Sequence, residues 1–444
     1  MALVRSIGRW TMTALVINCV IGSGIFGVPS ELIRLLGRAS PLAMIAAALA
    51  MATITLSMAE VASQFSEPGG VYLYARTAFG RFVGLQVGWF WLLAITAAGA
   101  AGANLFLSYL SAFFPAVTHG WTHAGALFLL IIIPTVANYR GVRDGVILSL
   151  LLTVAKLLPI GLVIVLGLLH GSHGMLLRSP APTVFSGWNA WLQALLLLIY
   201  SYSGYEDALV PTGEVLRPRQ TLPFALGTGL LICAVLYTLL QFVIVSTIGA
   251  SPSNHPLADA ASVLIGHNGA SFVALAVMIS TYGWISGAFL SAPRLAISLA
   301  AHGDCPTLLG RLHLRFGTPS AGILLYAIAV ILLAATGTFL WVLALTAGSM
   351  MIFYAVTCAA LIRLRRLQPD APALRVPFGP VFAVGGIVIS AVLLFQLEFR
   401  HVVLMSLTSF IAAVNWLWAR RNVTNAPGGK IRREAVTQST LANQ

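Results

Sequence analysis

The sequence predicts an all-α polytopic membrane protein with twelve transmembrane helices, and three observations support this fold class. Hydrophobic residues make up 59% of the chain and charged residues only 8%, a composition that needs lipid as its solvent. The apolar residues gather in stretches of about 20, the length that crosses a bilayer as a helix. The basic residues gather in alternate connections between these stretches, which is the pattern of a chain that crosses a membrane repeatedly.

The apolar stretches follow one another along the whole chain. They cover residues 11–36, 41–64, 82–112, 123–138, 145–169, 189–212, 221–249, 270–301, 319–335, 338–362, 379–397 and 401–419. The first superficially resembles a secretory signal, but no small-residue cleavage site follows it and the hydrophobicity continues past Phe26. We therefore interpret it as a retained helix. The polar tail from Asn422 to Gln444 is expected to be disordered.

Lysine and arginine residues predict the orientation in the membrane. The chain has 25 of them against 12 Asp and Glu, and a cytoplasmic N-terminus would place nearly all of them on the cytoplasmic side. The exceptions are Arg34, Arg38, Arg178 and Arg400 on the outer side and Lys156 within a span. Such a bias predicts an even number of helices with both termini in the cytoplasm. The net charge of +13 then reflects topology, and we expect no nucleic-acid partner.

Glycine and serine residues interrupt two of the spans at matching depths. They are Gly22, Ser23 and Gly24 in the first span, and Ser201, Ser203 and Gly204 in the sixth. Glycine weakens a helix interior by about 1 kcal/mol relative to alanine, so the backbone can unwind there. Corresponding broken helices in two halves are typical of inverted-repeat transporters, here with spans 1 to 5 and 6 to 10 as the repeats. Alternatively, the small residues form a helix-packing face.

Unwound backbone at membrane depth predicts a polar ligand. It frees N–H and C=O groups that lipid cannot satisfy, so these groups must line a cavity. The N-terminus of a half-helix favours a carboxylate, whereas freed carbonyls and C-terminal ends favour an ammonium group or a cation. A zwitterion such as an amino acid suits both, and it is the small-molecule partner that we expect besides the lipid bilayer.

Three charged residues fall at membrane depth within the predicted spans. An ammonium such as that of Lys156 costs roughly 3 kcal/mol near the middle of the hydrocarbon layer, so it persists where it faces a cavity, a partner or a transported ion. Glu206 and Asp207 directly follow the interruption in the sixth span. The protonation of Glu206 could respond to an occupied site, or its carboxylate could act only as a hydrogen-bonding group at a helix end.

The remaining chemistry-bearing residues predict neither a metal site nor an enzyme. His119, His123, His170 and His173 fall in outer segments without a cysteine or carboxylate nearby to complete a ligand set. The cysteines have no CxxC spacing. We see no nucleophile with a base at membrane depth. We therefore expect no metal, no cofactor and no catalysis, and the sequence leaves the oligomeric state open.

Short motifs in order along the chain resemble the amino acid/polyamine/organocation transporter superfamily, and within it the bacterial-type amino acid permeases. They are GSGIF at 22–26, EPGGVYLYARTAFG at 67–80, NYRGVR at 138–143, TVAKLLP at 153–159, SYSGYEDALVPTGEVLRPRQTLP at 201–223 and PRLAISLAAHGDCP at 293–306. This resemblance implies a five-plus-five inverted repeat (LeuT-like) with broken helices 1 and 6, and two peripheral helices.

The resemblance divides the chain into six parts. These are a cytoplasmic N-terminus at 1–10, the first repeat at 11–169, an outer loop at 170–188, the second repeat at 189–362, the peripheral helices with the inner loop before them at 363–419, and a cytoplasmic tail at 420–444. A multi-pass protein of the inner cell membrane is implied.

The resemblance also implies roles for the residues of the two interruptions. Backbone N–H groups around Gly22, Ser23 and Gly24 would bind the carboxylate of the substrate. The carbonyl groups of Val20, Tyr200 and Ser203 would bind its amino group, and Ser201 and Gly204 belong to the same substrate-binding set.

Gating and coupling roles are implied for four residues. Tyr200 and Trp284 stand where relatives carry gating aromatics, although tryptophan in a membrane helix is often a packing or interfacial residue. Lys156 resembles the helix 5 lysine of sodium-independent members, whose ammonium occupies the place of a coupling sodium ion. It would either carry a proton during the cycle or act as a permanently charged strut bonded to helix 1. Glu206 matches a position where some proton-sensing relatives carry glutamate.

The expected function is secondary active amino acid transport by alternating access, independent of sodium and driven by proton symport or by amino acid exchange. Neutral amino acids are weakly favoured, because only Glu206 and Asp207 could face a cationic side chain. One alternative is an antiporter of cationic amino acids or polyamines. An alternative of another class is a channel or a transport-dead membrane sensor.

Overall fold

The computed structural model describes residues 7–65, 70–140, 145–169, 187–209, 215–249, 253, 255–301, 303–304, 312–313, 315–369 and 374–425. Within these ranges the chain is helical apart from short connections, and one parallel bridge between Ile7 and Val215 lies outside the helices. Glu67, His170, His173, Cys305 and most of the predicted outer loop and tail lie outside the described residues.

The first half of the chain begins with an interrupted helix. The elements are α1 (Arg9–Val20), α2 (Gly24–Gly27), α3 (Pro29–Leu36), α4 (Ser40–Ser63), α5 (Gly70–Phe79), α6 (Arg81–Ser111), α7 (Gly120–Arg140) and α8 (Gly145–Leu169). The second half repeats the interruption at its start. Its elements are α10 (Trp188–Tyr202), α11 (Tyr205–Ala208), α12 (Pro218–Ile248), α13 (Pro256–Ala301), α15 (Ser320–Thr336), α16 (Phe339–Leu367), α17 (Gly379–Leu394) and α18 (Phe399–Asn425).

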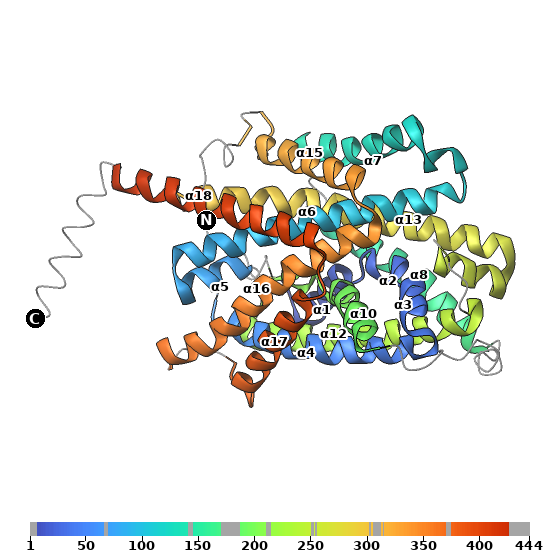
Figure 1. Ribbon diagram of the computed structural model, residues 1–444, viewed down its shortest axis with the longest axis horizontal. Helices are drawn as coiled ribbons and strands as arrows, with labels where there is room; N and C mark the ends of the chain where they lie inside the picture. The colour runs from blue at the N-terminus through green and yellow to red at the C-terminus, as the bar shows by residue number, and fades with distance from the viewer. Residues whose placement is uncertain are drawn as a thin grey trace, which may run out of the picture.

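Most long helices run along the longest axis of the molecule (Figure 1). The centre is built by α6 and α16, which pack against each other; α13 packs against α6, α4 packs against α16, and α12 packs against α4 and α13. In Figure 1, α7 and α15 lie along one side of this bundle, and α4, α12 and α17 along the opposite side. The interrupted helices α1, α2, α10 and α11 lie inside.

The helices fit a protein that crosses a membrane several times. Among the described residues, seven helical segments are long and apolar enough to span a bilayer, and α15 and α17 are shorter apolar helices. The count of twelve spans remains a prediction. Helices nevertheless lie over each of the predicted ranges, because periodic apolar stretches of this length have few other ways to satisfy their backbone in lipid.

Several helix boundaries differ from the sequence-based expectation, and one helix was not predicted. The helix predicted over 270–301 begins at Pro256, with a turn at Gly266 whose φ of 77° separates a first segment from the rest. Residues 70–79 form the additional helix α5. The helix predicted to end at 419 continues to Asn425, because hydropathy marks the apolar part of a helix and not its polar last turns.

Two carboxylates at one end of the bundle hold helix ends together. Glu60 on α4 accepts two hydrogen bonds from Arg365 on α16, both 2.6 Å long, and one from the backbone of Val376. Asp304, after α13, pairs with Arg81 of α6. Glu60 therefore organises the end of α4, through a partner that lies far away in sequence.

Candidate functional site

The two helix interruptions lie against each other in the middle of the bundle. The first covers Ile21 to Ser23, between α1 and α2, and the second covers Ser203 and Gly204, between α10 and α11. Both are shorter than predicted, since Gly24 is already the first residue of α2 and Ser201 is still in α10. α2 contacts α10, and α1 contacts α11.

Glycine is required at two of these contacts. A Cβ atom at Gly24 would lie 2.6 Å from Oγ of Ser201, which is closer than real contacts allow. Gly204 has a φ of 102° and a Cβ there would overlap with the carbonyl group of Cys19. The small residues thus act in both ways that the sequence left open, because they break the helices and also let them pack closely.

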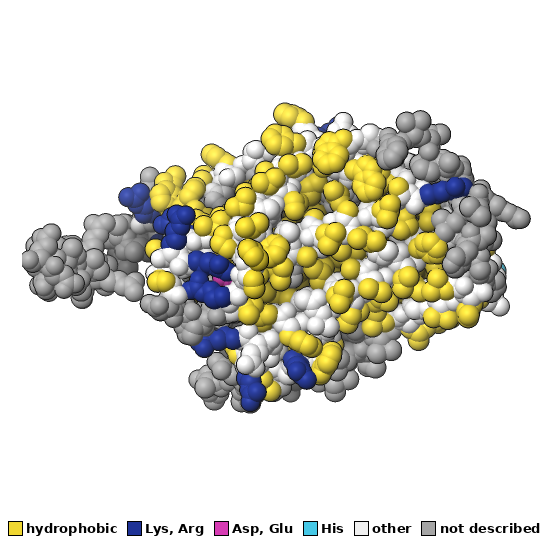
Figure 2. Space-filling model, turned by 90° about the horizontal axis from the view of Figure 1, so that it is seen from below, with side chains coloured by type: hydrophobic (Ala, Val, Ile, Leu, Met, Phe, Trp, Pro, Cys, Tyr) yellow, Lys and Arg dark blue, Asp and Glu magenta, His cyan; other side chains and the backbone are white. Residues whose placement is uncertain are grey.

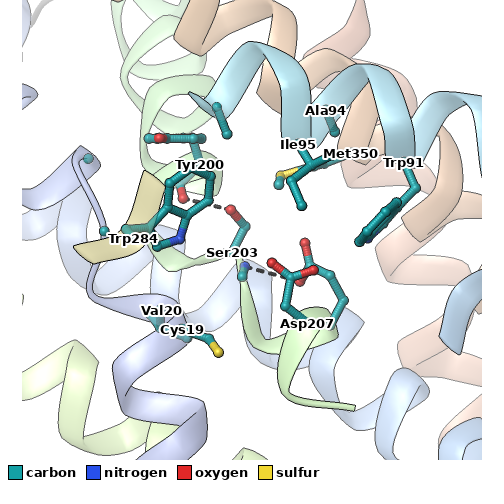
Figure 3. Close-up of a pocket in the computed structure, with 15 residues that line it drawn as sticks. Cys19, Val20, Trp91, Ala94, Ile95, Tyr200, Ser203, Asp207, Trp284 and Met350 are labelled. Atoms are coloured by element: carbon teal, nitrogen blue, oxygen red, sulfur yellow. Dashed lines mark hydrogen bonds between the residues drawn. The ribbon is translucent and has the colours of Figure 1, made fainter. Parts of the chain in front are cut away.

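A buried cavity lies beside the interruptions (Figure 3). The cavity is narrow, with a volume of about 30 Å³. The predicted residues that line it are Val20, Gly22, Gly24, Tyr200, Ser203, Gly204, Glu206 and Trp284. Ser23, Ser201 and Lys156 are not among its lining residues.

Tyr200 reaches across from α10 to the first interruption. Its hydroxyl group is 2.6 Å from Oγ of Ser23, and its side chain is 7% exposed. Trp284, from α13, lies beside Gly22, and a Cβ at Gly22 would be 3.8 Å from the indole ring. The two predicted gating aromatics thus flank the same interruption, at one end of the cavity (Figure 3).

The carbonyl groups of Val20 and Tyr200 already have internal partners. The carbonyl of Val20 accepts hydrogen bonds from the backbone of Gly22 at 2.8 Å and from the hydroxyl of Tyr237 at 3.1 Å. The carbonyl of Tyr200 accepts two from Ser203, through its backbone N–H at 3.2 Å and its hydroxyl at 2.7 Å. Because a carbonyl oxygen has two lone pairs, binding a substrate ammonium at either would displace one of these donors.

Glu206 is fixed by two hydrogen bonds to its Oε2 atom. The backbone N–H of Gly204 and the hydroxyl of Tyr354 on α16 both donate to it at 3.0 Å. Tyr205 stacks on Tyr354 with ring centroids 5.9 Å apart. Glu206 therefore acts as a hydrogen-bonding group in the first turn of α11 and also lines the cavity.

Lys156 contacts the first broken helix from α8. Its ammonium donates a hydrogen bond of 3.0 Å to the backbone carbonyl of Asn18 in the last turn of α1. The side chain is 2% exposed, and no carboxylate among the described residues is within ion-pair distance of it. This geometry is that of a strut between α8 and α1.

Comparison with known proteins supports the resemblance seen in the motifs. A sequence profile of the amino acid permease family matches residues 7–419. The chain belongs to this family. It is 26% identical over 403 residues to the serine/threonine exchanger SteT of Bacillus subtilis, covering 86% of this permease and 89% of the exchanger. It is also 26% identical over 387 residues to the large neutral amino acids transporter small subunit 2 of mouse and of human, covering 84% of this permease and 72% of each relative.

Several residues that line the cavity of the permease were not singled out from its sequence. Trp91, Ala94, Ile95 and Ala98 follow one another along one face of α6, and Met350 comes from α16. Their spacing is that of a helix face, but the sequence alone does not say which face of α6 meets the cavity. They make this wall of the site apolar, on the other side of the cavity from Tyr200 and Trp284 (Figure 3).

No metal site is formed in the part of the permease that the structure describes. Among these residues, no three His, Cys, Asp or Glu side chains lie close enough to share an ion. His123 instead hydrogen-bonds to the backbone carbonyl of Val117. The site therefore consists of helix ends, hydroxyl groups, two carboxylates and an apolar wall.

Proposed function

We propose that this permease moves an amino acid across the membrane by alternating access, with the substrate bound in the cavity beside the two helix interruptions. The observation that carries this proposal is that both interruptions open onto one buried cavity. Unwound backbone is tolerated at membrane depth only where it is buried in protein or lines a cavity. A polar ligand with two opposite charges is suited to backbone donors and acceptors that lie together.

The proposal includes the architecture that the sequence predicted. Twelve helices cross the inner membrane with both termini in the cytoplasm, and residues 11–169 and 189–362 form two inverted repeats. The similar placement of the interruptions at the start of each half supports this arrangement. An odd number of helices in each repeat then places α1 and α10 in opposite orientations across the cavity.

The substrate carboxylate would bind backbone N–H groups of Ser23 and Gly24, where α2 begins. N–H groups in the first turn of a helix have no partner within the helix. The substrate amino group would bind backbone carbonyls near the ends of α1 and α10, after Tyr237 or Ser203 has released one of its bonds. The side chain of the substrate would then face α6, where Trp91 and Ile95 favour an apolar group.

The coupling mechanism in this proposal does not use sodium. The ammonium of Lys156 lies against the last turn of α1, and its positive charge would repel a sodium ion there. Lys156 would act as a fixed strut in an exchanger, or would release and take up a proton in a symporter. Glu206 is the second candidate for the proton, since its side chain joins the second interruption, at Gly204, to α16, at Tyr354.

A cationic amino acid or a polyamine is the second candidate substrate. The observation that favours it is that Asp207 lines the cavity next to Glu206 (Figure 3). A carboxylate there would attract a second positive charge on the substrate. Asp207→Asn should then lower uptake of cationic substrates and leave uptake of neutral ones unchanged, whereas equal uptake by both proteins would remove this candidate.

Uptake of a panel of radiolabelled amino acids into proteoliposomes in sodium-free buffer tests the proposal. Accumulation that requires an inward proton gradient would identify a symporter. Uptake that requires preloaded amino acid would identify an exchanger. Failure of external substrate to accelerate efflux of loaded substrate, together with no uptake, would favour the channel or sensor alternative and refute the proposal.

A further inference from the structure

An apolar groove runs along the outside of the bundle between α4 and α12, separate from the cavity at the interruptions. Its volume is about 530 Å³. Small residues such as Ala48, Ala52 and Gly227 line it, and Leu49 and Leu231 stand exposed along it. Figure 2 shows the molecule from this side, and apolar side chains cover most of the face.

The shape of the groove suits a long and thin ligand. Its lining residues on α12 extend from Pro223 to Leu239, which corresponds to about 24 Å at 1.5 Å per residue. This is most of the thickness of a hydrocarbon core of about 30 Å. Lipid tails already surround the groove in a bilayer, so its apolar lining alone selects no particular lipid. Selection requires a polar group at one end.

Arginine side chains supply that polar group at the Pro223 end. Arg219 precedes Pro223 by four residues and therefore lies on the same face of α12 as the groove. Leu374 lines the groove and its backbone N–H bonds to Ser63 at the end of α4; the next residue, Arg375, also donates a hydrogen bond to the carbonyl of Pro369. Both arginines are exposed. In Figure 2, the Lys and Arg side chains on this face gather mostly toward one end of the molecule.

We propose that this groove binds an anionic phospholipid, with one acyl chain along α4 and α12 and the phosphate at Arg219 and Arg375. A membrane-surface arginine contributes about 1 kcal/mol to the attraction of an anionic lipid. The groove then recognises its ligand through both charge and shape. The lipid comes from the leaflet on the arginine-rich side of the membrane.

Photoactivatable lipids test this site on the full-length protein. The protein is reconstituted in vesicles of phosphatidylcholine that contain a trace of diazirine-labelled phosphatidylglycerol or diazirine-labelled phosphatidylcholine, and the labelled peptides are identified by mass spectrometry. We expect peptides of α4 and α12 to be labelled more by phosphatidylglycerol. Arg219→Gln and Arg375→Gln should each lower this labelling about fivefold, the equivalent of ~1 kcal/mol, without changing the labelling by phosphatidylcholine.

A second pair of variants tests the groove itself. Gly227→Phe should fill it, because a Cβ at this position meets no atom within 4 Å, and should reduce labelling of α4 and α12 by both lipids. Gly385→Phe on α17, where a Cβ also meets nothing within 4 Å, is the matched control. Arg315→Gln, in the connection before α15, is the control for the loss of an exposed arginine. Neither control should change the labelling.

Two outcomes would overturn the proposal. Equal labelling of wild-type α4 and α12 by the two lipids would show that the arginines select no head group. Crosslinks between two protein copies at α4 and α12, in place of lipid labelling, would show that a protein helix occupies the groove. If Gly227→Phe does not fold, the two arginine variants still decide, because they leave the groove lining intact.

Discussion

Replacing Gly24 by valine tests whether the close contact between the two broken helices controls substrate binding. A Cβ at this position would lie 2.6 Å from Oγ and 2.9 Å from Cα of Ser201, and 3.0 Å from Cδ1 of Tyr200. Carbon atoms pack at about 3.5–4.0 Å, so α2 and α10 must separate by about 0.5–1 Å. Overpacking of this kind typically costs about 1–3 kcal/mol.

This strain affects the start of α2, where the substrate carboxylate is proposed to bind. Separation of α2 from α10 also pulls apart the hydroxyl groups of Ser23 and Tyr200, which are 2.6 Å apart. At 1.4 kcal/mol for each factor of ten, binding should weaken about 5- to 150-fold. Uptake of the best substrate from the amino acid panel, measured over a range of concentrations and normalised to the amount of protein in the membrane, reports this loss.

Gly22→Ala is the matched control for this experiment. A Cβ at Gly22 would be 3.8 Å from Trp284, an ordinary contact, so this variant should bind substrate nearly as well as wild type. The reasoning is refuted if both variants lower uptake alike. It is also refuted if Gly24→Val lowers insertion into the membrane as much as uptake, because Gly24 would then serve folding alone.

Three further predictions concern buried charges. Lys156→Ala should impair transport, because α1 loses the hydrogen bond at Asn18. Uptake by the wild-type protein should be the same in sodium and choline buffers. A lower uptake in choline buffer would contradict sodium independence. Arg365→Ala should lower the free energy of unfolding by about 3–5 kcal/mol, because Glu60 is left buried without its ion pair. Thermal unfolding in detergent measures this loss, and an unchanged midpoint would contradict it. Arg365→Lys should be intermediate, since lysine cannot make the two parallel bonds.

The positions of the interrupted helices could be predicted because their cause is local. Gly22 and Gly204 weaken the helix at their own positions, and nothing distant is needed to locate the breaks. A contact between Lys156 and α1 is one of the two interpretations that the sequence allows. An ammonium within the membrane needs a hydrogen-bond acceptor, and the carbonyl groups at an unwound helix end provide one.

Other parts of the site depend on the packing of distant segments. Nothing near Trp91 or Met350 in sequence indicates that their helix faces meet the cavity. The hydroxyl of Tyr237 donates a hydrogen bond to the carbonyl of Val20, more than two hundred residues away in sequence. Arg365 pairs with Glu60, which is 305 residues away. Hydropathy reports that these helices are buried in lipid or protein, but it carries no information about which neighbour each face has.

The broken helices contact each other through glycine at two separate places beside the cavity. Gly24 rests on Ser201 where α2 meets α10, and Gly204 rests on the carbonyl of Cys19 where α1 meets α11. In the transport cycle proposed above, one of these contacts would open while the other stays closed. Each half-helix would then move about the unwound backbone next to it. The proposed transport cycle requires only that the two contacts are never open at the same time.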